Sequence, residues 1–375
     1  MGVVGVRRPA WAEISRGALA HNVATLRRIL GTSELCAVIK ANGYGHGAII
    51  AASTLREAGV TQFAVAILDE ALELRDAGID EPILLLAEIP ADTLDDAVAG
   101  RVTLTVGSVE GAKAAAAAAA RHGVVHPVHV KIDTGMLRMG ARPEEVADVV
   151  REVTSSPSLT LEGLFTHFPV ADGTSEEDVA FTQHQLELFK QMVAAIRSAG
   201  HEVPLIHSAN SAAALTVPEA RLSFARVGLA LYGYHPGIDP ADLEPVLSIK
   251  AKVTAVRHAE AGERPSYGRR RALAAPARLA TVPFGYADGY PRRLFDAGMD
   301  VLINGRRYPL AGMVTMDQLI VDCGDDEVSV GDEVVLLGRQ GDEQITADDW
   351  ARAAGTISWE ILCGIGARVP RVVVD

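Results

Sequence analysis

Short apolar runs alternate with amphipathic segments over the first 235 residues of the chain. Eight of these runs are rich in Val, Ile and Leu and have the length of strands: residues 35–40, 63–67, 82–87, 102–106, 127–133, 161–168, 204–209 and 224–229. Helical patterns separate most of them, and Ser15 and Ser108 precede two of these patterns as expected N-caps. This alternation predicts an α/β fold with an N-terminal (β/α)8 TIM-type barrel. An open doubly wound sheet is the alternative, but its GxGxxG fingerprint is absent after the first run.

The pattern changes near residue 245. Strand-like segments at 248–263, 277–290, 300–324 and 332–343 follow one another through Gly and Asp turns, with one helical stretch at 346–354. We therefore expect a barrel over residues 1–243, whose first 12 or so residues could pair with the following domain. Residues 244–375 are expected to form a predominantly β C-terminal domain.

Composition narrows the function classes. The 375 residues are 49% hydrophobic and 22% charged, which is typical of a globular protein, and the net charge of −13 disfavours nucleic acid as a partner. Three cysteines set far apart favour neither a disulfide framework nor a cysteine-rich metal site. The sequence has no signal-peptide pattern and no apolar run long enough for a membrane span, so we expect a cytoplasmic protein without a membrane partner.

The segment CAVIKANGYGHG (36–47) places Lys40 at the end of the first apolar run. Catalytic groups of a TIM barrel lie at this end of the strands, and the three glycines that follow allow backbone to approach a ligand closely. A partly desolvated lysine has a lowered pKa and forms Schiff bases. Taken alone, Lys40 is equally compatible with a surface lysine at the start of a loop.

Polar residues also lie at the ends of the last four predicted strands or directly after them. They are Lys131, Asp133 and Arg138, then His167, then His207, Asn210 and Ser211, and finally Arg226 and Gly228. The loops after strands seven and eight of a barrel commonly bind phosphate. A single histidine in such a place is more often structural than catalytic. A Schiff-base lysine opposite a phosphate-binding loop, however, indicates a pyridoxal phosphate site.

With these motifs the chain resembles the fold-type III alanine racemases. VIKANGYGHG is similar to the motif of their cofactor lysine. The other motifs follow in the order of that family: KIDTGMLRMG (131–140), THF (166–168), HSANSAA (207–213), ARVGLALYG (225–233), SYG (266–268), GYADGY (285–290), MVTMDQ (313–318) and TISWEILCGIGARVPR (356–371). The resemblance covers nearly the whole chain. It implies a homodimeric enzyme that uses pyridoxal 5'-phosphate to interconvert L-alanine and D-alanine with two bases, and thereby supplies D-alanine for peptidoglycan.

The resemblance also implies a role for each matching residue, and no metal. Lys40 would hold the cofactor and act as one base, and Tyr267 of the partner subunit would be the other. Arg226 would face the pyridine nitrogen, with His207 behind it. The other expected cofactor contacts are Tyr44, His167, Asn210, Ser211, Gly228, Leu229 and Trp359. Arg138 and the backbone of Met316 would bind the substrate carboxylate or a cofactor oxygen, with Lys131, Tyr286 and Asp317 around the site or at its entrance. Lys131 matches a lysine that is carbamylated in some members.

One position departs from the family pattern. The family usually has TINYE where this chain has TISWE, so Trp359 replaces a tyrosine whose hydroxyl would contact the phosphate. An indole N–H donates one hydrogen bond but cannot accept one.

Three other functions are alternatives to alanine racemisation. A racemase for serine or lysine would differ in pocket loops that the sequence does not resolve. A non-catalytic pyridoxal phosphate carrier has no need of the second domain or of Tyr267. The related decarboxylases pair a carboxylate with the pyridine nitrogen, whereas this chain has Arg226.

Overall fold

The computed structural model describes residues 7–235 and 242–375, which form two compact units. The first, called here the barrel unit, consists of Leu19–Gly43 and Ala48–Glu244. The second, called the β unit, consists of the described residues up to Ala18, the short segment Tyr44–Gly47, and Pro245–Asp375.

The β unit thus takes two pieces of chain from within the range 1–243 that was expected to form the barrel. Strand β1 (Ala10–Ser15) pairs antiparallel with β10 (Leu247–Lys252) and parallel with β18 (Arg371–Val374). The segment Tyr44–Gly47 is held through the carbonyl of Gly45, which accepts hydrogen bonds from the Arg371 side chain at 2.9 and 2.8 Å.

The barrel unit is built on eight parallel strands. They are β2 (Glu34–Val38), β3 (Phe63–Val65), β4 (Ile83–Leu85), β5 (Leu104–Val106), β6 (His126–Lys131), β7 (Leu159–Phe165), β8 (Leu205–His207) and β9 (Phe224–Val227). They pair in the orders β4-β3-β2-β9 and β5-β6-β7-β8. A parallel bridge from Leu84 to Thr103 joins β4 to β5, and the N–H of Arg226 donates to the Ala209 carbonyl between the last two strands. The predicted (β/α)8 barrel is therefore confirmed.

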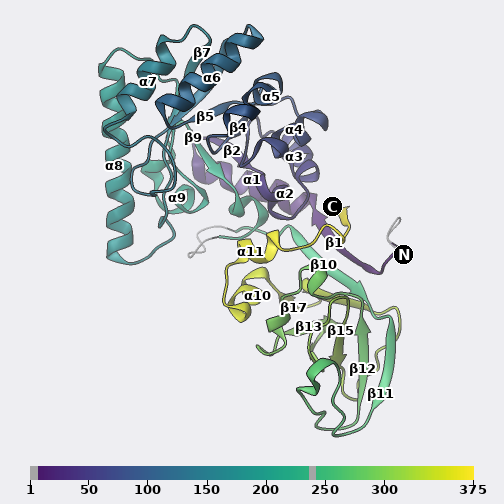
Figure 1. Cartoon of the computed structure of the whole chain (residues 1–375). Helices are drawn as coiled ribbons and strands as arrows, with labels where there is room; N and C mark the ends of the chain where they lie inside the picture. Colours follow the sequence, from purple (N-terminus) through teal and green to yellow (C-terminus); the bar gives the residue numbers. More distant parts are fainter. Residues whose placement is uncertain (1–6, 236–241) are drawn as a thin grey trace. The chain divides into compact units, whose positions relative to one another are not determined.

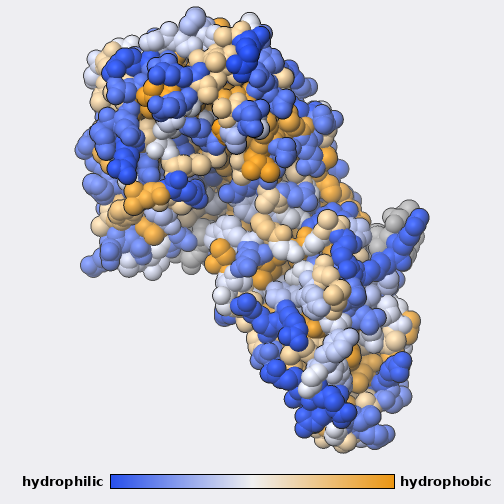
Figure 2. All heavy atoms as spheres, in the orientation of Figure 1, coloured by the Kyte–Doolittle hydropathy of each residue, from blue (hydrophilic) through white to orange (hydrophobic). Residues whose placement is uncertain are grey.

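Helices cover the outside of this sheet (Figure 1). They are α1 (Arg16–Leu30, continuing from the β unit), α3 (Ala48–Glu57), α4 (Leu68–Asp76), α5 (Leu94–Ala99), α6 (Val109–His122), α7 (Val146–Ser155), α8 (Glu176–Ser198) and α9 (Ser211–Thr216). Alanine-rich α6 begins at Ser108, whose hydroxyl accepts from the N–H of Gly111, and ends at Gly123 with a φ of 68°. Long α8 begins after Ser175 with three acidic residues, which suit the positive end of the helix dipole. Figure 2 shows mainly hydrophilic side chains along its outer edge.

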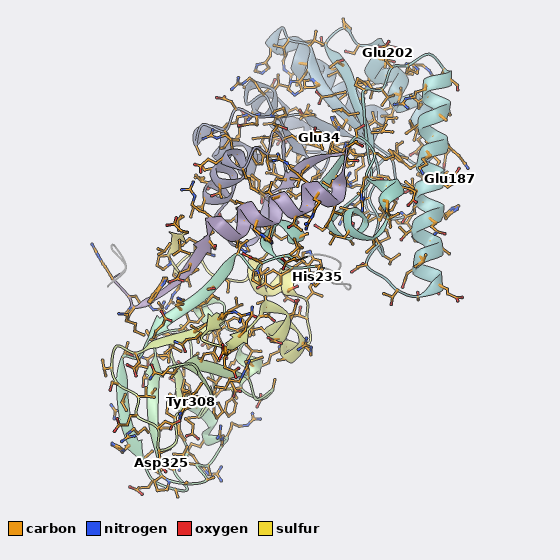
Figure 3. The ribbon with its side chains drawn as sticks, turned by 180° about the vertical axis from the view of Figure 1, so that it is seen from behind. Glu34, Glu187, Glu202, His235, Tyr308 and Asp325 are labelled. Atoms are coloured by element: carbon orange, nitrogen blue, oxygen red, sulfur yellow. The ribbon has the colours of Figure 1, made fainter. Side chains whose placement is uncertain are left out.

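Each predicted strand of the barrel is present but shorter than its apolar run. Glu34, labelled in Figure 3, begins β2 at one end of the barrel, and the strand stops at Val38. Lys40 therefore lies beyond the strand and not within it. Similarly, His167 lies two residues after β7.

The β unit contains two sheets. The larger has the order β14-β13-β16-β10-β1-β18, with β17 (Glu343–Ile345) added to β16. Its remaining strands are β13 (Asp300–Ile303), β14 (Arg306–Pro309) and β16 (Glu333–Gln340). On β14 the hydroxyl of Tyr308, labelled in Figure 3, donates to Asp326 at 2.8 Å. The predicted helix is α10 (Ala347–Ala354), which Thr346 caps, and α11 (Ser358–Cys363) follows it.

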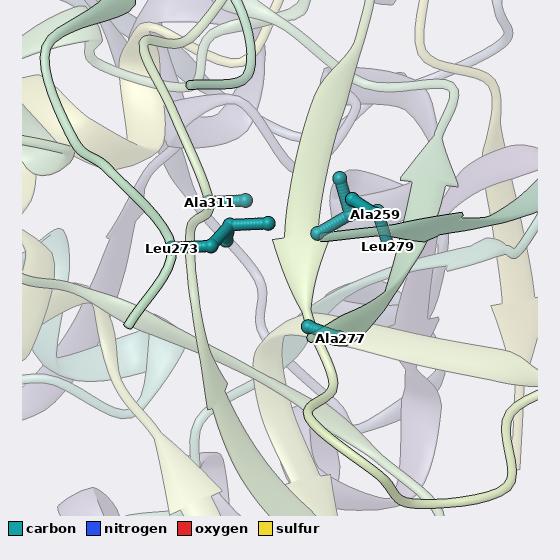
Figure 4. Packing of buried hydrophobic residues seen from close by; sticks show 5 residues of the cluster. All are labelled: Ala259, Leu273, Ala277, Leu279 and Ala311. Atoms are coloured by element: carbon teal, nitrogen blue, oxygen red, sulfur yellow. The ribbon is translucent and has the colours of Figure 1, made fainter. Parts of the chain in front are cut away.

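The second sheet has three antiparallel strands, β11 (Ala255–Ala259), β12 (Ala277–Val282) and β15 (Leu319–Asp322). A small apolar cluster of Ala259, Leu273, Ala277, Leu279 and Ala311 packs at this sheet (Figure 4). Three of the five members are alanines, so the loops that carry Leu273 and Ala311 approach the strands closely. Together the two sheets form the predicted β-rich domain.

Candidate active site

Lys40 begins a turn of unusual backbone geometry. In α2 (Lys40–Tyr44), Ala41, Asn42 and Gly43 have φ values of 52°, 54° and 61°, so this segment is not a right-handed helix. Left-handed conformations are unfavourable for residues with a Cβ, and runs of them occur mainly at functional sites. Two side chains hold the turn: Glu70 accepts from the N–H of Ala41 at 2.6 Å, and Asn42 accepts from the N–H of Ala48 at 2.7 Å.

Arg226 occupies the end of β9 and is 3% exposed. One terminal nitrogen lies 2.7 Å from His207 Nδ1, and the other donates to the carbonyls of Thr166 at 2.8 Å and Ser208 at 3.0 Å. The second nitrogen also lies 3.3 Å from His167 Nδ1. Burial lowers the pKa of Arg226 to about 10, so the side chain still carries its charge at neutral pH.

The two histidines beside Arg226 are neutral. Burial, followed by the charge of Arg226, lowers the pKa values of both His167 and His207 well below their usual range. His207 is stacked between Phe165 and Phe224, with ring centroids at 4.7 and 4.1 Å. The two stacked rings therefore fix the orientation of the imidazole, and with it the position of the Nδ1 atom that faces Arg226.

Lys131 lies at the end of β6 and is 5% exposed. Its Nζ donates to the Leu86 carbonyl at 3.1 Å and lies 5.3 Å from the centre of the Phe165 ring. Burial, and next the charge of Arg226, lowers the pKa of Lys131 to about 7. The amine is thus largely uncharged above neutral pH.

A tight turn follows Lys131. Asp133 Oδ1 accepts from the N–H groups of Gly135 at 2.9 Å and Leu137 at 3.1 Å. Leu137 has a φ of 57° and is 84% exposed, and Arg138 beside it is also exposed. The turn therefore presents both side chains away from the barrel core.

The loops after β8 and β9 are joined by Ser211. Its buried hydroxyl accepts from the N–H of Gly228 at 2.9 Å and faces that of Ala230 at 3.4 Å. Asn210 precedes it, caps α9 through the N–H of Ala213 at 3.0 Å, and donates to the Phe168 carbonyl at 3.1 Å. Leu229 is buried beside Gly228. These residues therefore form one compact group at the ends of β8 and β9.

The end of the barrel where these loops meet is positively charged. The pKa of His167 is lowered first by burial and then by the charge of Arg226, with smaller effects of Lys131, Arg138 and Lys40. A cluster of this kind favours anionic ligands such as a phosphate or a carboxylate.

The remaining predicted site residues lie in the β unit, and hydrogen bonds join the loops that carry four of them. The hydroxyl of Ser266, next to Tyr267, donates to the Met313 carbonyl at 2.6 Å. The N–H groups of Tyr286 and Ala287 donate to the carbonyls of Thr315 and Met316 at 3.1 and 3.0 Å. Tyr267, Tyr286 and Met316 are 72%, 43% and 53% exposed. Asp317 is exposed beside Met316 and pairs with Arg368 at 2.6 Å.

Tyr44 and Trp359 also belong to the β unit. Tyr44 is 7% exposed and has a φ of 52°, and Trp359 is half-buried on α11. A Cβ on Gly45 would meet the Leu362 carbonyl at 2.1 Å, so only glycine permits this approach of the segment to α11. The segment Tyr44–Gly47 therefore packs against α11, the helix that carries Trp359.

Three site residues were missed from the sequence. Glu70 holds the turn after Lys40, His129 lies 2.8 Å from His207, and Glu162 lies 3.0 Å from His129. The HVK spacing of His129 and Lys131 is a usable signal, because alternate strand residues share a face. Glu70 and Glu162 depend on contacts between distant segments and leave no such pattern.

Two domain families match the chain. Residues 14–236 match "Alanine racemase, N-terminal domain" and residues 246–373 match "Alanine racemase, C-terminal domain". The chain belongs to the alanine racemase family. An alanine racemase of Halothermothrix orenii is 42% identical over 371 residues, which cover 98% of this chain and 97% of that protein. The family resemblance that the motifs indicate is thereby confirmed, and with it membership of a pyridoxal phosphate-dependent isomerase family.

Solved structures of racemases have a fold similar to that of this chain. The alanine racemase of Clostridium difficile 630 has a TM-score of 0.92 and 37% identity, over 98% of this chain and 96% of that one. A histidine racemase of Leuconostoc mesenteroides also matches, with a TM-score of 0.89 and 31% identity over 98% and 99% of the two chains. The alanine racemase is thus the nearer of these two in both fold and sequence.

None of the helices in residues 7–235 and 242–375 is both long and apolar enough to cross a membrane. In the same residues, His, Cys, Asp and Glu side chains form no group of three or more that could hold a metal ion.

Proposed function

We propose that this protein is a pyridoxal 5'-phosphate-dependent alanine racemase that interconverts L-alanine and D-alanine. One observation carries the proposal: β2 and β9 pair in parallel, with Cys36 opposite Arg226, so Lys40 and Arg226 come to the same end of the barrel. A lysine that forms a Schiff base and a buried arginine at the same strand ends are the two groups that this chemistry requires of the barrel.

The residues present fit the cofactor. Arg226 is a buried cation whose four hydrogen-bond partners described above are neutral, which is a costly arrangement unless a ligand compensates the charge. The group formed by Asn210, Ser211, Gly228 and Leu229 suits a phosphate. The cofactor would supply a sink for the electron pair that remains when the α-proton of alanine is removed.

The protein's own residues would divide the remaining work. Lys40 would hold the cofactor and move the proton at one face of the α-carbon, and Tyr267 of the partner subunit would move it at the other. Two bases are needed because one side chain cannot reach both faces of a planar centre. Arg226 only donates hydrogen bonds, so it would pair with an unprotonated ring nitrogen. His167 and Tyr44 would contact the cofactor beside it, and Trp359 would take the place of the family tyrosine near the phosphate.

Substrate selection would depend on a second group of residues. Arg138 and the backbone of Met316 would bind the carboxylate of alanine, because a guanidinium and an N–H group both donate to carboxylate oxygens. Tyr286 and Asp317 would line the entrance.

We further propose a homodimer in which each site takes residues from both chains. Tyr267 supports this proposal, because a tyrosine that is 72% exposed performs no proton transfer in isolation. Its loop is strained, with φ values of 67° at Ser266 and 47° at Arg269. Strain of this kind persists where it serves a site, and a partner subunit would supply the remainder of that site. We also infer a cytoplasmic enzyme whose D-alanine is used for peptidoglycan.

Two experiments test the proposed function. Borohydride reduction followed by peptide mapping should place the pyridoxyl group on Lys40, and a label on another lysine would contradict the assignment. The purified protein should then be incubated with L-alanine, L-serine, L-lysine and L-histidine, followed by chiral separation. Alanine should racemise fastest. Faster turnover of another amino acid would favour the broader racemase, and a cofactor without turnover would favour a carrier.

A further inference from the structure

A chain of hydrogen bonds leads from Arg226 through the barrel to an acidic side chain at its surface. Arg226 Nη1 lies 2.7 Å from His207 Nδ1, and His207 Nε2 lies 2.8 Å from His129 Nδ1. His129 Nε2 in turn lies 3.0 Å from Glu162 Oε2. The side chain of His129 is 3% exposed and that of Glu162 is 37% exposed, so the chain runs from the interior to solvent.

The two residues at the ends of this hydrogen-bond series, Arg226 and Glu162, fix the position of every proton within it. A guanidinium only donates, so His207 Nδ1 must accept and its proton lies on Nε2. His207 therefore donates to His129 Nδ1, which must accept in turn. The proton of His129 then lies on Nε2 and is donated to Glu162, and an ionised carboxylate only accepts. Both histidines thus carry their proton on Nε2, and every donor in this series meets an acceptor.

The barrel is locally irregular where it accommodates His129 and Glu162. Val128 pairs with Leu161 and His129 pairs with Gly163, so Glu162 is an extra residue of β7 at a bulge. A Cβ on Gly163 would lie 2.8 Å from atoms of the His129 ring, so the missing side chain makes room for that ring. The bulge and the glycine both serve the same contact.

We propose that His129 and Glu162 are positioning residues that hold Arg226 through His207, with Glu162 selecting the tautomers of both histidines. The proposal rests on the proposed function, which places Arg226 at the cofactor ring. The reverse tautomers would put an N–H of His207 against the guanidinium. An acceptor at position 162 excludes this arrangement, and a donor there would favour it.

Variants at position 162 test this directly in the cofactor-free protein. Glu162→Gln keeps an acceptor in its amide oxygen, whereas Glu162→Lys offers only donors. Selective ¹⁵N labelling of histidine distinguishes the two tautomers by their ring couplings. We expect Nε2–H at both histidines in the wild type and in Glu162→Gln, and a change at His129 or His207 in Glu162→Lys. Nδ1–H at either ring in the wild type, or unchanged tautomers in Glu162→Lys, would overturn the proposal.

The same variants are then loaded with pyridoxal phosphate. Glu162→Lys should weaken cofactor binding or lower kcat by about tenfold, as loss of an outer hydrogen-bond partner commonly does at metal sites. Glu162→Gln should stay within about twofold of the wild type, because its oxygen still accepts. Thr160→Lys, an exposed residue of the same strand, is the matched control and should have no effect. Equal losses in Thr160→Lys and Glu162→Lys would overturn the proposal.

Gly163→Ala disturbs the contact between His129 and Glu162 from the His129 side. This variant takes the place of Glu162→Lys if Glu162→Lys does not fold. It should displace the His129 ring and reduce cofactor affinity or kcat. Gly17→Ala is the control, because Gly17 is exposed and a Cβ there would meet its nearest non-neighbouring atom at 3.5 Å. Full activity in Gly163→Ala, with the protein folded, would overturn the proposal. A wild type that does not racemise alanine would contradict the proposed function instead and leave the tautomer experiment intact.

Discussion

Arg226 and His207 are held together inside the barrel by a contact of 2.7 Å between Nη1 and Nδ1. The two residues come from neighbouring strands, β9 and β8, and the Phe165 and Phe224 rings stack on both sides of the imidazole. Burial of a guanidinium among neutral partners costs free energy, so the surrounding residues must hold its orientation. The stacked imidazole of His207 holds the Arg226 side chain in this orientation.

Replacement of His207 by Leu should therefore destabilise the protein. The change leaves a donor of Arg226 without an acceptor, at a cost of about 1–3 kcal/mol in the free energy of unfolding. Urea unfolding of the cofactor-free protein measures this loss, and titration with pyridoxal phosphate should show weaker binding as well.

His126→Leu is the control for this prediction. His126, at the start of β6, is also buried, and its Nε2 lies 2.9 Å from the Val102 carbonyl. Its replacement should cost stability and leave cofactor affinity unchanged. If both variants weakened the cofactor equally, His207 would have no special role in orienting Arg226.

Much of the barrel could be predicted from the sequence because its signals are local. A strand overlaps each of the eight apolar runs, and Ser15 caps α1 through the N–H of Ala18 at 3.0 Å. The lysine motif could be located for the same reason, since it directly follows an apolar run.

Other features depend on contacts between distant segments and left no local pattern. Ala41, Asn42 and Tyr44 adopt left-handed backbone, although only the glycines around them suggested an unusual turn. The pairing of Glu162 with His129 requires a bulge that becomes visible only once β6 and β7 are aligned. Likewise, Tyr44–Gly47 joins the β unit through Arg371, which is 326 residues away from Gly45.

Trp359→Tyr should tighten cofactor binding. If the indole does not replace the hydrogen bond of the family tyrosine, the phosphate lacks a contact worth about 1.5–3 kcal/mol, which is the usual range for a bond to a charged group. Titration of cofactor-free protein should then show at least several-fold stronger binding. Trp359→Phe is the control, because it has no donor; if it weakened binding while Trp359→Tyr left it unchanged, the indole already donates adequately.

Lys131 should make stability depend on pH. The pKa of Lys131 is lowered from 10.5 to about 7 in the folded protein, so the unfolded chain binds more protons between these values. Stability from this group therefore rises as pH increases from about 7 to 10.5, by at most about 1.4 kcal/mol per pH unit. Urea unfolding in carbonate-free buffer should show a shallower rise in Lys131→Met. An identical slope in both proteins would mean that Lys131 is protonated in the folded state.

The same lowered pKa should make Lys131 reactive toward carbon dioxide. An uncharged amine adds to it and releases one proton to the solvent to form a carbamate, and the neighbouring cations Arg138 and Arg226 would stabilise the resulting negative charge. We expect a carbamate signal in the carbon NMR spectrum of protein equilibrated with ¹³C-bicarbonate. The signal should be absent in Lys131→Met; a signal that persists there belongs to another amine.

Each active site should draw on two chains. Lys40→Ala and Tyr267→Ala homodimers should both be almost inactive, because every site in them lacks one base. In a mixed dimer one site lacks both bases and the other has both intact. Random exchange of subunits should therefore restore about a quarter of wild-type activity, since half of the dimers are mixed and each has one working site. Mass spectrometry under native conditions confirms the exchange independently. Absence of recovery in a confirmed mixture would mean that Lys40 and Tyr267 serve a site within one chain, and the exposure of Tyr267 would then require another explanation.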